Sequence, residues 1–578
     1  MQTRALLLAA LAVSLSPAPL QAQTIYPIDR AEILSGAKFD LKIEFPAGAT
    51  LESVTVNGAV AESLSSNASK VIDREDGSDH SAYWLRDVSL PAPGAYEVLA
   101  KTSSGTARVN WTVFGTPERK ARNVILFIGD GMSMAHRTAA RILSKGIVEG
   151  KYGGELAIDD MPQMALVSTA GSDSIVTDSA NSMSAYTTGH KTCVNAMGVY
   201  CALNESPFAH PKVENLTSLV QRRQKMAVGI VTNSELSDAT PAAMVAQTRR
   251  RAEKAAIVRM FFDAKPDVLM GGGSAYFTPF GTPGSLRKDN QDFATKFKEA
   301  GYAYAATSLE LKSVSQNADA KKLLGLFNSG DVDGALDLKF LKKGTVADFP
   351  DQPDLVEQTK AALDVLERAP NGFLLMVESA RIDKYSHSLD WERAVYDTIM
   401  LDNAVKTAKD YAAKRNDTLI IVVADHGHPV SLAGTYDDER PGNSSRAKLG
   451  VYADAKFPNY PPADPSGYPP AIDVSRRLAL LFSAFPDHCF SGKPFLSGEF
   501  KPTQKAANDT FAANDAFCKD GAERREGNLP IEAGSGVHSG DDVVLTAIGP
   551  GAERFHGRID NTFVFRAISE ALGLGEKN

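Results

Sequence analysis

From Asn123 onward, unbroken apolar runs alternate with segments of helical periodicity. The runs include VILFIG, VGIVT, FLLMV and LIIVVA, and the longest helical segment is DWERAVYDTIMLDNAVKTAKDYAAK. Apolar runs without polar alternation are typical of strands buried on both faces, as in a mostly parallel sheet between helices. We therefore predict an α/β fold, a three-layer αβα sandwich, for residues 117–578.

Polar side chains stand at the ends of several of these runs. Asp130 follows VILFIG, Glu378 follows FLLMV, and Asp425 and His426 follow LIIVVA. In open α/β sheets, ligands bind at the carboxyl ends of the strands. Because such groups are costly to bury without partners, a metal is their natural partner. The pattern predicts a metal-bearing site at that edge.

The preceding segment alternates like a set of strands instead. In KFDLKIEF, residues 38–45, apolar and polar side chains have the period of a half-buried strand. Further strand candidates follow, separated by turn signals such as Asn57-Gly58 and Pro93-Gly94. We predict an immunoglobulin-like β-sandwich domain at residues 23–116, with no cluster of reactive side chains.

The first residues have the pattern of a cleaved secretory signal. Arg4 precedes a short apolar run from Ala5 to Leu15, and small residues lead to Ala22. The run is too short for a membrane anchor, and no later segment is long and apolar enough to span. We expect a signal peptide at residues 1–22, no membrane span, and a periplasmic or secreted location.

Cysteine usage agrees with export. The chain has four cysteines, and an even number in an exported chain favours disulfides. Four cysteines allow three connectivities, among which the sequence does not choose. The local pairing would join Cys193 to Cys201 and Cys489 to Cys518.

Chain length and net charge limit the number of domains and the kinds of binding partner to be expected. A chain of 578 residues is expected to form at least two domains. The net charge of −8 and the lack of a dense basic run argue against a nucleic-acid partner. The Pro-, Gly- and Asn-rich stretch between His428 and His538 predicts a cap-like insertion at about residues 430–536.

Ligand spacing points to divalent metal. Asp383 and His387 are four residues apart in RIDKYSH, so a helix would place both on one face. The structural alternative is a surface Asp–His pair. His538, in SGVHSGDDVV, could equally be a structural histidine with satisfied hydrogen bonds.

Ser179, in VTDSANSMSAY, lies where an extended segment gives way to a helix-like run. The positive end of a helix dipole favours an alkoxide and an incoming phosphate. Local residues alone favour the alternative that Asp178 or Ser179 is only an N-cap.

Taken together, these motifs resemble the alkaline phosphatase family. The strings GDGM, VTDSA, DATPAA, VES-x-x-IDK-x-x-H, ADHGH and VHSGDDV occur in the family's order. The resemblance covers the chain from about Asn123 onward, apart from the insertion before His538, and excludes the N-terminal β segment. Where relatives usually have smaller residues after the serine, this chain has Asn181-Ser182-Met183.

The resemblance implies a role for each matching residue. Ser179 is similar to the nucleophile, and Arg251 to the phosphate-binding arginine, although Arg249 and Arg250 stand beside it. The implied ligands are Asp383, His387 and His538 for one zinc, Asp130, Asp425 and His426 for the second, and Asp130, Thr240 and Glu378 for magnesium. The implied supporting residues are Asp178, which would orient the arginine, Asp238 and Lys384, which would tune the magnesium site and phosphate, and His428, near Asp425.

The activity implied is that of an alkaline phosphatase. Such an enzyme hydrolyses small phosphate monoesters through a phosphoserine intermediate, with two zinc ions and one magnesium. Relatives are often homodimers, so a homodimer is a candidate assembly. The alternatives are a phosphodiesterase of the same superfamily and a non-catalytic, metal-bearing binding protein. Thr240, Glu378 and Arg251 favour monoesters, because diesterases commonly lack the third metal site and the phosphate arginine.

Overall fold

The structure is a computed structural model that describes residues 23–519 and 521–577. The predicted signal peptide, residues 1–22, lies outside the described residues. The chain divides into two compact units. One contains the described residues up to Ala31 with Asp40–Val88 and Ala95–Trp111, and the other contains Glu32–Phe39, Ser89–Gly94 and the described residues from Thr112 onward.

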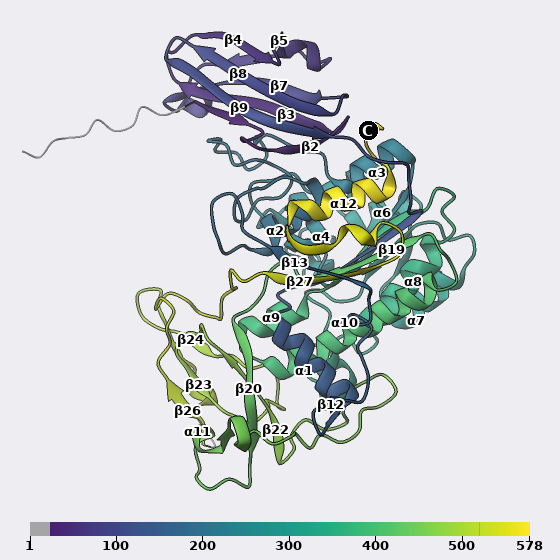
Figure 1. Cartoon of the computed structure of the whole chain (residues 1–578). Coiled ribbons are helices and arrows are strands. Elements are labelled where there is room, and N and C mark those ends of the chain that lie inside the picture. The colour runs from purple at the N-terminus through teal and green to yellow at the C-terminus, as the bar shows by residue number, and fades with distance from the viewer. Residues whose placement is uncertain (1–22, 520, 578) are drawn as a thin grey trace, which may run out of the picture. The chain divides into compact units, whose positions relative to one another are not determined.

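The N-terminal strands form two β-only sheets (Figure 1). One has the strand order β1-β3-β7-β6 and the other the order β2-β9-β8-β4-β5. The strands are β1 (Thr24–Tyr26), β2 (Glu32–Leu34), β3 (Lys38–Pro46), β4 (Leu51–Val56), β5 (Ala59–Val60), β6 (Lys70–Ile72), β7 (His80–Ser89), β8 (Gly94–Thr102) and β9 (Gly105–Phe114). The β-only architecture agrees with the sequence prediction.

Strand β3 corrects one detail of that prediction. Its alternating pattern predicts polar side chains facing solvent, but Lys42 is fully buried. Its ammonium lies 2.6 Å from Glu44 Oε1 and 2.8 Å from Glu75 Oε2. Because the charges pair with one another inside the unit, this face can be buried without an isolated charge.

The larger unit is built on a sheet of ten strands with the order β16-β17-β15-β14-β18-β10-β19-β27-β13-β28. Its strands are β10 (Asn123–Gly129), β13 (Gln163–Ser168), β14 (Ala227–Glu235), β15 (Val268–Gly272), β16 (Ala303–Ala305), β17 (Leu323–Leu326), β18 (Phe373–Ser379), β19 (Thr418–Val423), β27 (Val543–Ile548) and β28 (His556–Asp560). Only β27 runs antiparallel to its neighbours among these described strands. The central strands β10, β18 and β19 are buried along their whole length, as the apolar runs predict.

Helices cover both faces of this sheet (Figure 1). One layer contains α1 (Met134–Lys145), α7 (Ser308–Gln316), α8 (Leu355–Leu366), α9 (Arg381–His387) and α10 (Trp391–Ala412), and the other contains α2 (Ser179–Thr188), α3 (Leu216–Gln224), α4 (Ala239–Ala242) and α12 (Thr562–Leu572). The remaining helices are α5 (Lys254–Ala264), α6 (Phe293–Glu299) and α11 (Ser445–Lys448). The predicted three-layer α/β architecture is confirmed.

The stretch predicted as an insertion has little helix. It contains a three-stranded sheet of β20 (Val430–Asp437), β21 (Leu449–Gly450) and β22 (Arg476–Phe482), with the short pairs β23 (His488–Phe490) with β26 (Glu523–Arg525) and β24 (Thr503–Lys505) with β25 (Phe511–Ala513). A disulfide joins Cys489 to Cys518, and a second joins Cys193 to Cys201. Disulfides are typical of proteins in oxidising compartments.

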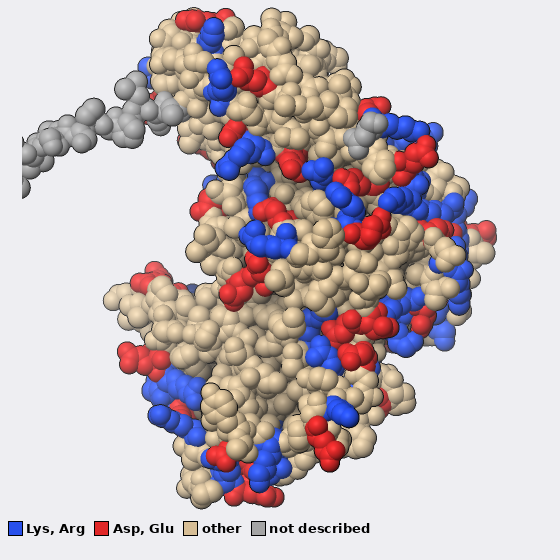
Figure 2. All heavy atoms as spheres, viewed as in Figure 1, with Lys and Arg blue, Asp and Glu red and all other residues tan. Residues whose placement is uncertain are grey.

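Two further features concern possible partners. Among the described residues, no helix has the length and apolar character needed to cross a membrane. On the face drawn in Figure 2, basic and acidic side chains are interspersed over the described surface. The mixture gives that face no extended field of one sign.

Candidate functional site

Strand register brings three acidic side chains to one edge of the sheet. Ile128 of β10 pairs with Glu378 of β18 on one side and with Val423 of β19 on the other. Asp130 lies two residues beyond Ile128 and Asp425 two residues beyond Val423, so both stand at the same level just past the ends of neighbouring strands. Both are buried, as is Glu378. The parallel register thus brings these strand ends together at one edge, where the sequence predicted a site.

Ser179 is the first residue of α2 and faces this edge. Its Oγ lies 3.4 Å from Asp130 Oδ2 and 3.2 Å from His426 Nε2. Asp178 is the N-cap and accepts a hydrogen bond from the Asn181 amide, so the N-cap alternative applies to Asp178 and leaves the serine hydroxyl free of that task. The hydroxyl therefore sits between a carboxylate and an imidazole, at the positive end of a helix.

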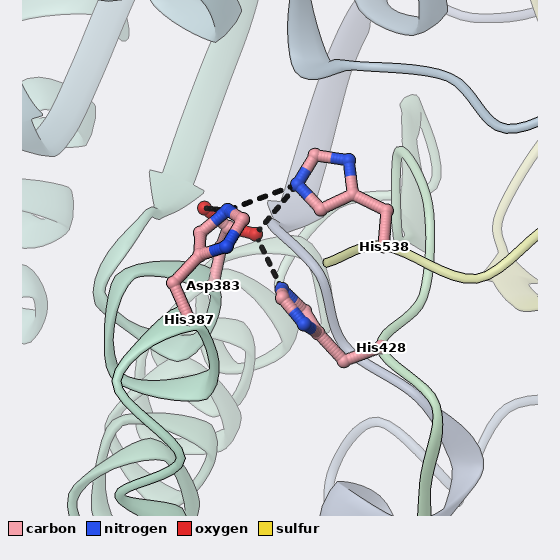
Figure 3. A group of neighbouring side chains, drawn as sticks. All are labelled: Asp383, His387, His428 and His538. Carbon is pink, nitrogen blue, oxygen red and sulfur yellow. Dashed lines mark hydrogen bonds and ion pairs between the residues drawn. The ribbon is translucent and has the colours of Figure 1, made fainter. Parts of the chain in front are cut away.

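Asp383 is surrounded by three imidazoles (Figure 3). His428 Nε2 lies 2.7 Å from Asp383 Oδ1, and His538 Nε2 lies 3.3 Å from the same oxygen. His387, one turn along α9, places its Nε2 3.4 Å from Asp383 Oδ2. The family resemblance places His428 near Asp425, and in the structure its Nε2 is hydrogen-bonded to Asp383.

A second group of potential ligands adjoins the first. His426 Nε2 lies 3.4 Å from Asp130 Oδ1 and 3.3 Å from Asp425 Oδ2. The rings of His426 and His538 are stacked with centroids 3.5 Å apart. The two groups therefore touch, and together they bring residues from α9, from the segments that follow β10 and β19, and from the segment before β27 into one site.

Burial and mutual repulsion disturb the acidity of these carboxyl groups. Burial, with the charges of Asp383 and Asp425, raises the pKa of Asp130 well above its usual value. Burial likewise raises the pKa of Glu378 to about 8 and that of Asp425 to about 6. Such shifts mark a place where several negative charges are held together without enough compensation, which a bound cation would supply.

Several buried atoms of this site also lack hydrogen-bond partners. Among the described residues, these atoms include Asp130 Oδ1, Asp425 Oδ2, His426 Nδ1 and Thr240 Oγ1. Buried polar atoms are normally satisfied by protein, water or an ion. The donors are carboxylate, imidazole and hydroxyl, which suit zinc and magnesium. The residues present therefore fit the metals that the sequence motifs imply.

Thr240 and Glu378, the residues expected to share a third metal with Asp130, are both buried. Thr240 lies in the short helix α4, whose N-cap is Asp238. Glu378 Oε2 accepts a short hydrogen bond from the Thr232 hydroxyl. Sequence reasoning missed Thr232, although its place at the end of VGIVT is the same signal that identified the other strand-end residues.

Arg251 is held by two carboxylates beside the serine. Its Nη1 lies 3.2 Å from Asp178 Oδ2 and its Nη2 lies 2.8 Å from Asp238 Oδ1. Lys384 Nζ lies 2.7 Å from the other oxygen of Asp238. Although burial opposes it, the charges of Lys384 and Arg251 hold the pKa of Asp238 well below its usual value. Two cationic side chains, Arg251 and Lys384, thus lie next to the cluster of potential metal ligands.

The structure also separates the three consecutive arginines. Arg249 donates from Nη1 to the carbonyl of Val194 at 2.9 Å. Arg250 is exposed. Only Arg251 of the three forms ion pairs with both Asp178 and Asp238 within the described part of the chain.

Comparison with known proteins identifies the family of the larger unit. The family model described as alkaline phosphatase matches residues 121–574. An alkaline phosphatase of Gadus morhua is 28% identical over 494 residues, which cover 79% of this chain and 93% of the relative. Alkaline phosphatase 4 of Bacillus subtilis is 30% identical over 465 residues, which cover 79% of this chain and 89% of the relative.

Solved structures agree on the fold. The crystal structure of Thermus thermophilus alkaline phosphatase superposes with a TM-score of 0.56 at 22% identity, covering 80% of this chain and 94% of that one. The alkaline phosphatase of the Antarctic bacterium TAB5 gives a TM-score of 0.53 at 21% identity, covering 78% and 98%.

Proposed function

This chain belongs to the alkaline phosphatase family of phosphomonoesterases, and we propose that it hydrolyses phosphate monoesters through a phosphoserine at Ser179. The observation that carries this proposal is the position of the Ser179 hydroxyl. It stands at a helix N-terminus, within 3.4 Å of both Asp130 and His426. The Asp178 carboxylate beside it binds the Arg251 guanidinium.

Two zinc ions and one magnesium are the proposed cofactors. Asp383, His387 and His538 would hold one zinc, Asp130, Asp425 and His426 the second, and Asp130, Thr240 and Glu378 the magnesium. When bound, such cations lower the pKa of a hydroxyl or water and stabilise charge on the attacking and leaving oxygens. His428 would orient Asp383, to which it is hydrogen-bonded at 2.7 Å.

The chain's own residues would position the phosphate and receive it. Arg251 offers a planar fork that can bind two nonbridging phosphate oxygens at once. Asp178 and Asp238 fix that fork, and Lys384 adds a second positive charge through Asp238. A phosphoryl transition state is loose, so positioning and charge stabilisation carry most of its catalysis.

The bond changes divide into two displacements. The Ser179 hydroxyl loses its proton and its Oγ forms a bond to phosphorus while the bond from phosphorus to the ester oxygen breaks, and that oxygen takes up a proton to give the alcohol. A water oxygen then attacks the phosphorus of the phosphoserine, the bond from Oγ to phosphorus breaks, and Oγ takes up a proton from that water as inorganic phosphate is released. Both steps use the same phosphate-binding groups, since the phosphoryl group stays beside Arg251.

A direct test compares two substrates at alkaline pH with zinc and magnesium supplied. We expect p-nitrophenyl phosphate to be hydrolysed far faster than bis-p-nitrophenyl phosphate. A preference for the diester would favour the phosphodiesterase alternative and would mean that Arg251 or the magnesium residues are misassigned. Bound zinc without turnover of either substrate would favour a binding protein.

We also propose a cellular location, an assembly and domain limits for this protein. Two disulfides and the signal-like first residues support a periplasmic or secreted location. A homodimer is the proposed assembly, to be measured by sedimentation equilibrium. We further propose domain limits at residues 23–116 and 117–578, with the insertion at about 430–536.

A further inference from the structure

The segment Cys193–Cys201, which we call the disulfide loop, lies beside the proposed phosphate-binding residues. A disulfide joins its two ends, which are 8 positions apart. Cys193, Ala196 and Val199 form a small buried cluster of their own, with Cys201 packed against it. The loop is thus a separately closed element with its own apolar centre.

The main chain of one residue in this loop, Asn195, contacts both members of the Asp178–Arg251 ion pair. The backbone amide of Asn195 donates to Asp178 Oδ1 at 3.2 Å. The Asn195 carbonyl accepts from the backbone amide of Arg251 at 2.9 Å. The Asn195 main chain therefore fixes the position of the carboxylate and that of the arginine backbone at the same time.

Further contacts align the loop with the segment that leads to Arg251. Met197 and Thr248 exchange backbone hydrogen bonds of 2.8 and 2.9 Å. The Val194 carbonyl accepts from Arg249 at 2.9 Å. Because these bonds lie on both sides of Asn195, a change in the loop's shape would displace Arg251 and its neighbours together.

The conformation of Asn195 itself needs support. Its φ is +70°, in the left-handed region that Asn tolerates and bulky or β-branched residues do not. Its side chain is exposed, so its own burial contributes little to holding this conformation. Covalent closure of the loop limits the alternative conformations open to it.

We propose that the disulfide loop is a positioning element for phosphate binding, in which the Cys193–Cys201 bond holds the Asn195 main chain against Asp178 and Arg251. This inference rests on the proposed role of Arg251. The loop does not touch phosphate. It acts by keeping the guanidinium fork aimed at the place where the phosphate of substrate and product binds.

The expected kinetic signature follows from that role. Arg251 would bind phosphate in the substrate, the transition state and the product. A displaced Arg251 guanidinium therefore weakens the binding of substrate, transition state and product alike. This raises KM and the inhibition constant of inorganic phosphate more than it lowers kcat. A displacement of about 1 Å can cost up to a hundredfold, so we expect a rise of about tenfold or more.

The test uses the full-length, metal-loaded enzyme and inorganic phosphate as the probe. The variant C193S/C201S removes the bond, and C489S/C518S removes the other disulfide as a matched control. Both are also made in an Arg251→Ala background. We expect C193S/C201S to raise the phosphate inhibition constant in the wild-type background and to change it little when Arg251 is absent, because the loop acts through that residue.

A second pair of variants tests the Asn195 main chain and leaves both cysteines in place. Asn195→Gly tolerates the left-handed conformation, whereas Asn195→Val disfavours it. We expect Asn195→Val to weaken phosphate binding more than Asn195→Gly does. This pair keeps the inference testable if the serine variant fails to fold, as checked by circular dichroism.

The outcomes separate the two proposals. An Arg251→Ala enzyme with an unchanged phosphate inhibition constant would overturn both the role of Arg251 and that of the loop. If Arg251→Ala and C193S/C201S change the free energy of phosphate binding additively, the positioning role of the loop would be overturned and the role of Arg251 would stand. Equal effects of the two Asn195 variants, or equal effects of the two disulfide removals, would also overturn it.

Discussion

The Nε2 atoms of His387 and His538 lie 3.0 Å apart, although the two residues are 151 positions apart in the chain. The other ring nitrogen of each is hydrogen-bonded to a carbonyl, His387 Nδ1 to Gly536 at 2.6 Å and His538 Nδ1 to Thr177 at 2.7 Å. Since a carbonyl only accepts, both Nδ1 atoms carry protons. In neutral rings both Nε2 atoms then present lone pairs to each other, an arrangement that a shared cation stabilises.

We therefore predict that His387→Ala and His538→Ala each lower the zinc content of the purified protein and its activity. Removing zinc with a chelator should abolish turnover, and adding zinc should restore it in the unaltered protein. The zinc content per protein chain is measured by inductively coupled plasma mass spectrometry. His556→Ala, at an exposed histidine of β28, is the control. Equal zinc content in all three variants would contradict this ligand assignment.

Asp238 is predicted to stabilise the fold through the two cations that it binds. Its carboxylate lies 2.8 Å from Arg251 and 2.7 Å from Lys384. Asp238→Ala leaves both cations without this partner, so we expect the free energy of unfolding to fall by about 3 kcal/mol. Denaturant unfolding of the variant measures this.

The matched control for that change is an exposed pair. Asp263 lies 3.7 Å from Arg259, and the Asp263 side chain is 65% exposed. We expect Asp263→Ala to cost about 0.5 kcal/mol or less, because exposed ion pairs are screened by water. A similar loss in both variants would mean that the Asp238 network does not stabilise the fold.

Asp402, in α10, is predicted to make stability depend on pH. It is buried and accepts a hydrogen bond from the Ile158 amide at 2.9 Å, and burial raises its pKa to about 6. Because the folded pKa exceeds the unfolded value of about 4, its stabilising contribution is full below pH 4 and is lost as the pH rises through 6.

Asp402→Asn keeps an oxygen acceptor and removes this titration. We expect the variant to gain stability relative to the wild type between about pH 4 and pH 7, on the order of 1–3 kcal/mol. The comparison uses denaturant unfolding of metal-free protein, so that metal release at low pH does not contribute. A difference that is constant across this range would show that Asp402 does not titrate as described.

The sequence predicted the sheet edge well because strand burial and strand ends obey local rules. VILFIG and LIIVVA are apolar throughout, so Asp130 and Asp425 were expected at the ends of buried strands, and the structure makes those two strands neighbours. The helical spacing of Asp383 and His387 is likewise local, and both lie in α9. Their roles as ligands remain a proposal.

Other features depend on contacts that the sequence does not encode locally. The hydrogen bond of His428 to Asp383 joins residues 45 positions apart in the chain. The burial of Lys42 depends on Glu75, which lies outside its own strand. The ion pairs of Arg251 with Asp178 and Asp238 likewise join residues 73 and 13 positions apart.

The central claim is that Ser179 accepts the phosphoryl group, and acid quenching during turnover of a ³²P-labelled monoester tests it most directly. The account predicts a covalent label on the peptide that contains Ser179. Ser179→Ala should lose the label and lower kcat by a factor on the order of a thousand or more. Full turnover in Ser179→Ala, or a label on a different residue, would contradict the account.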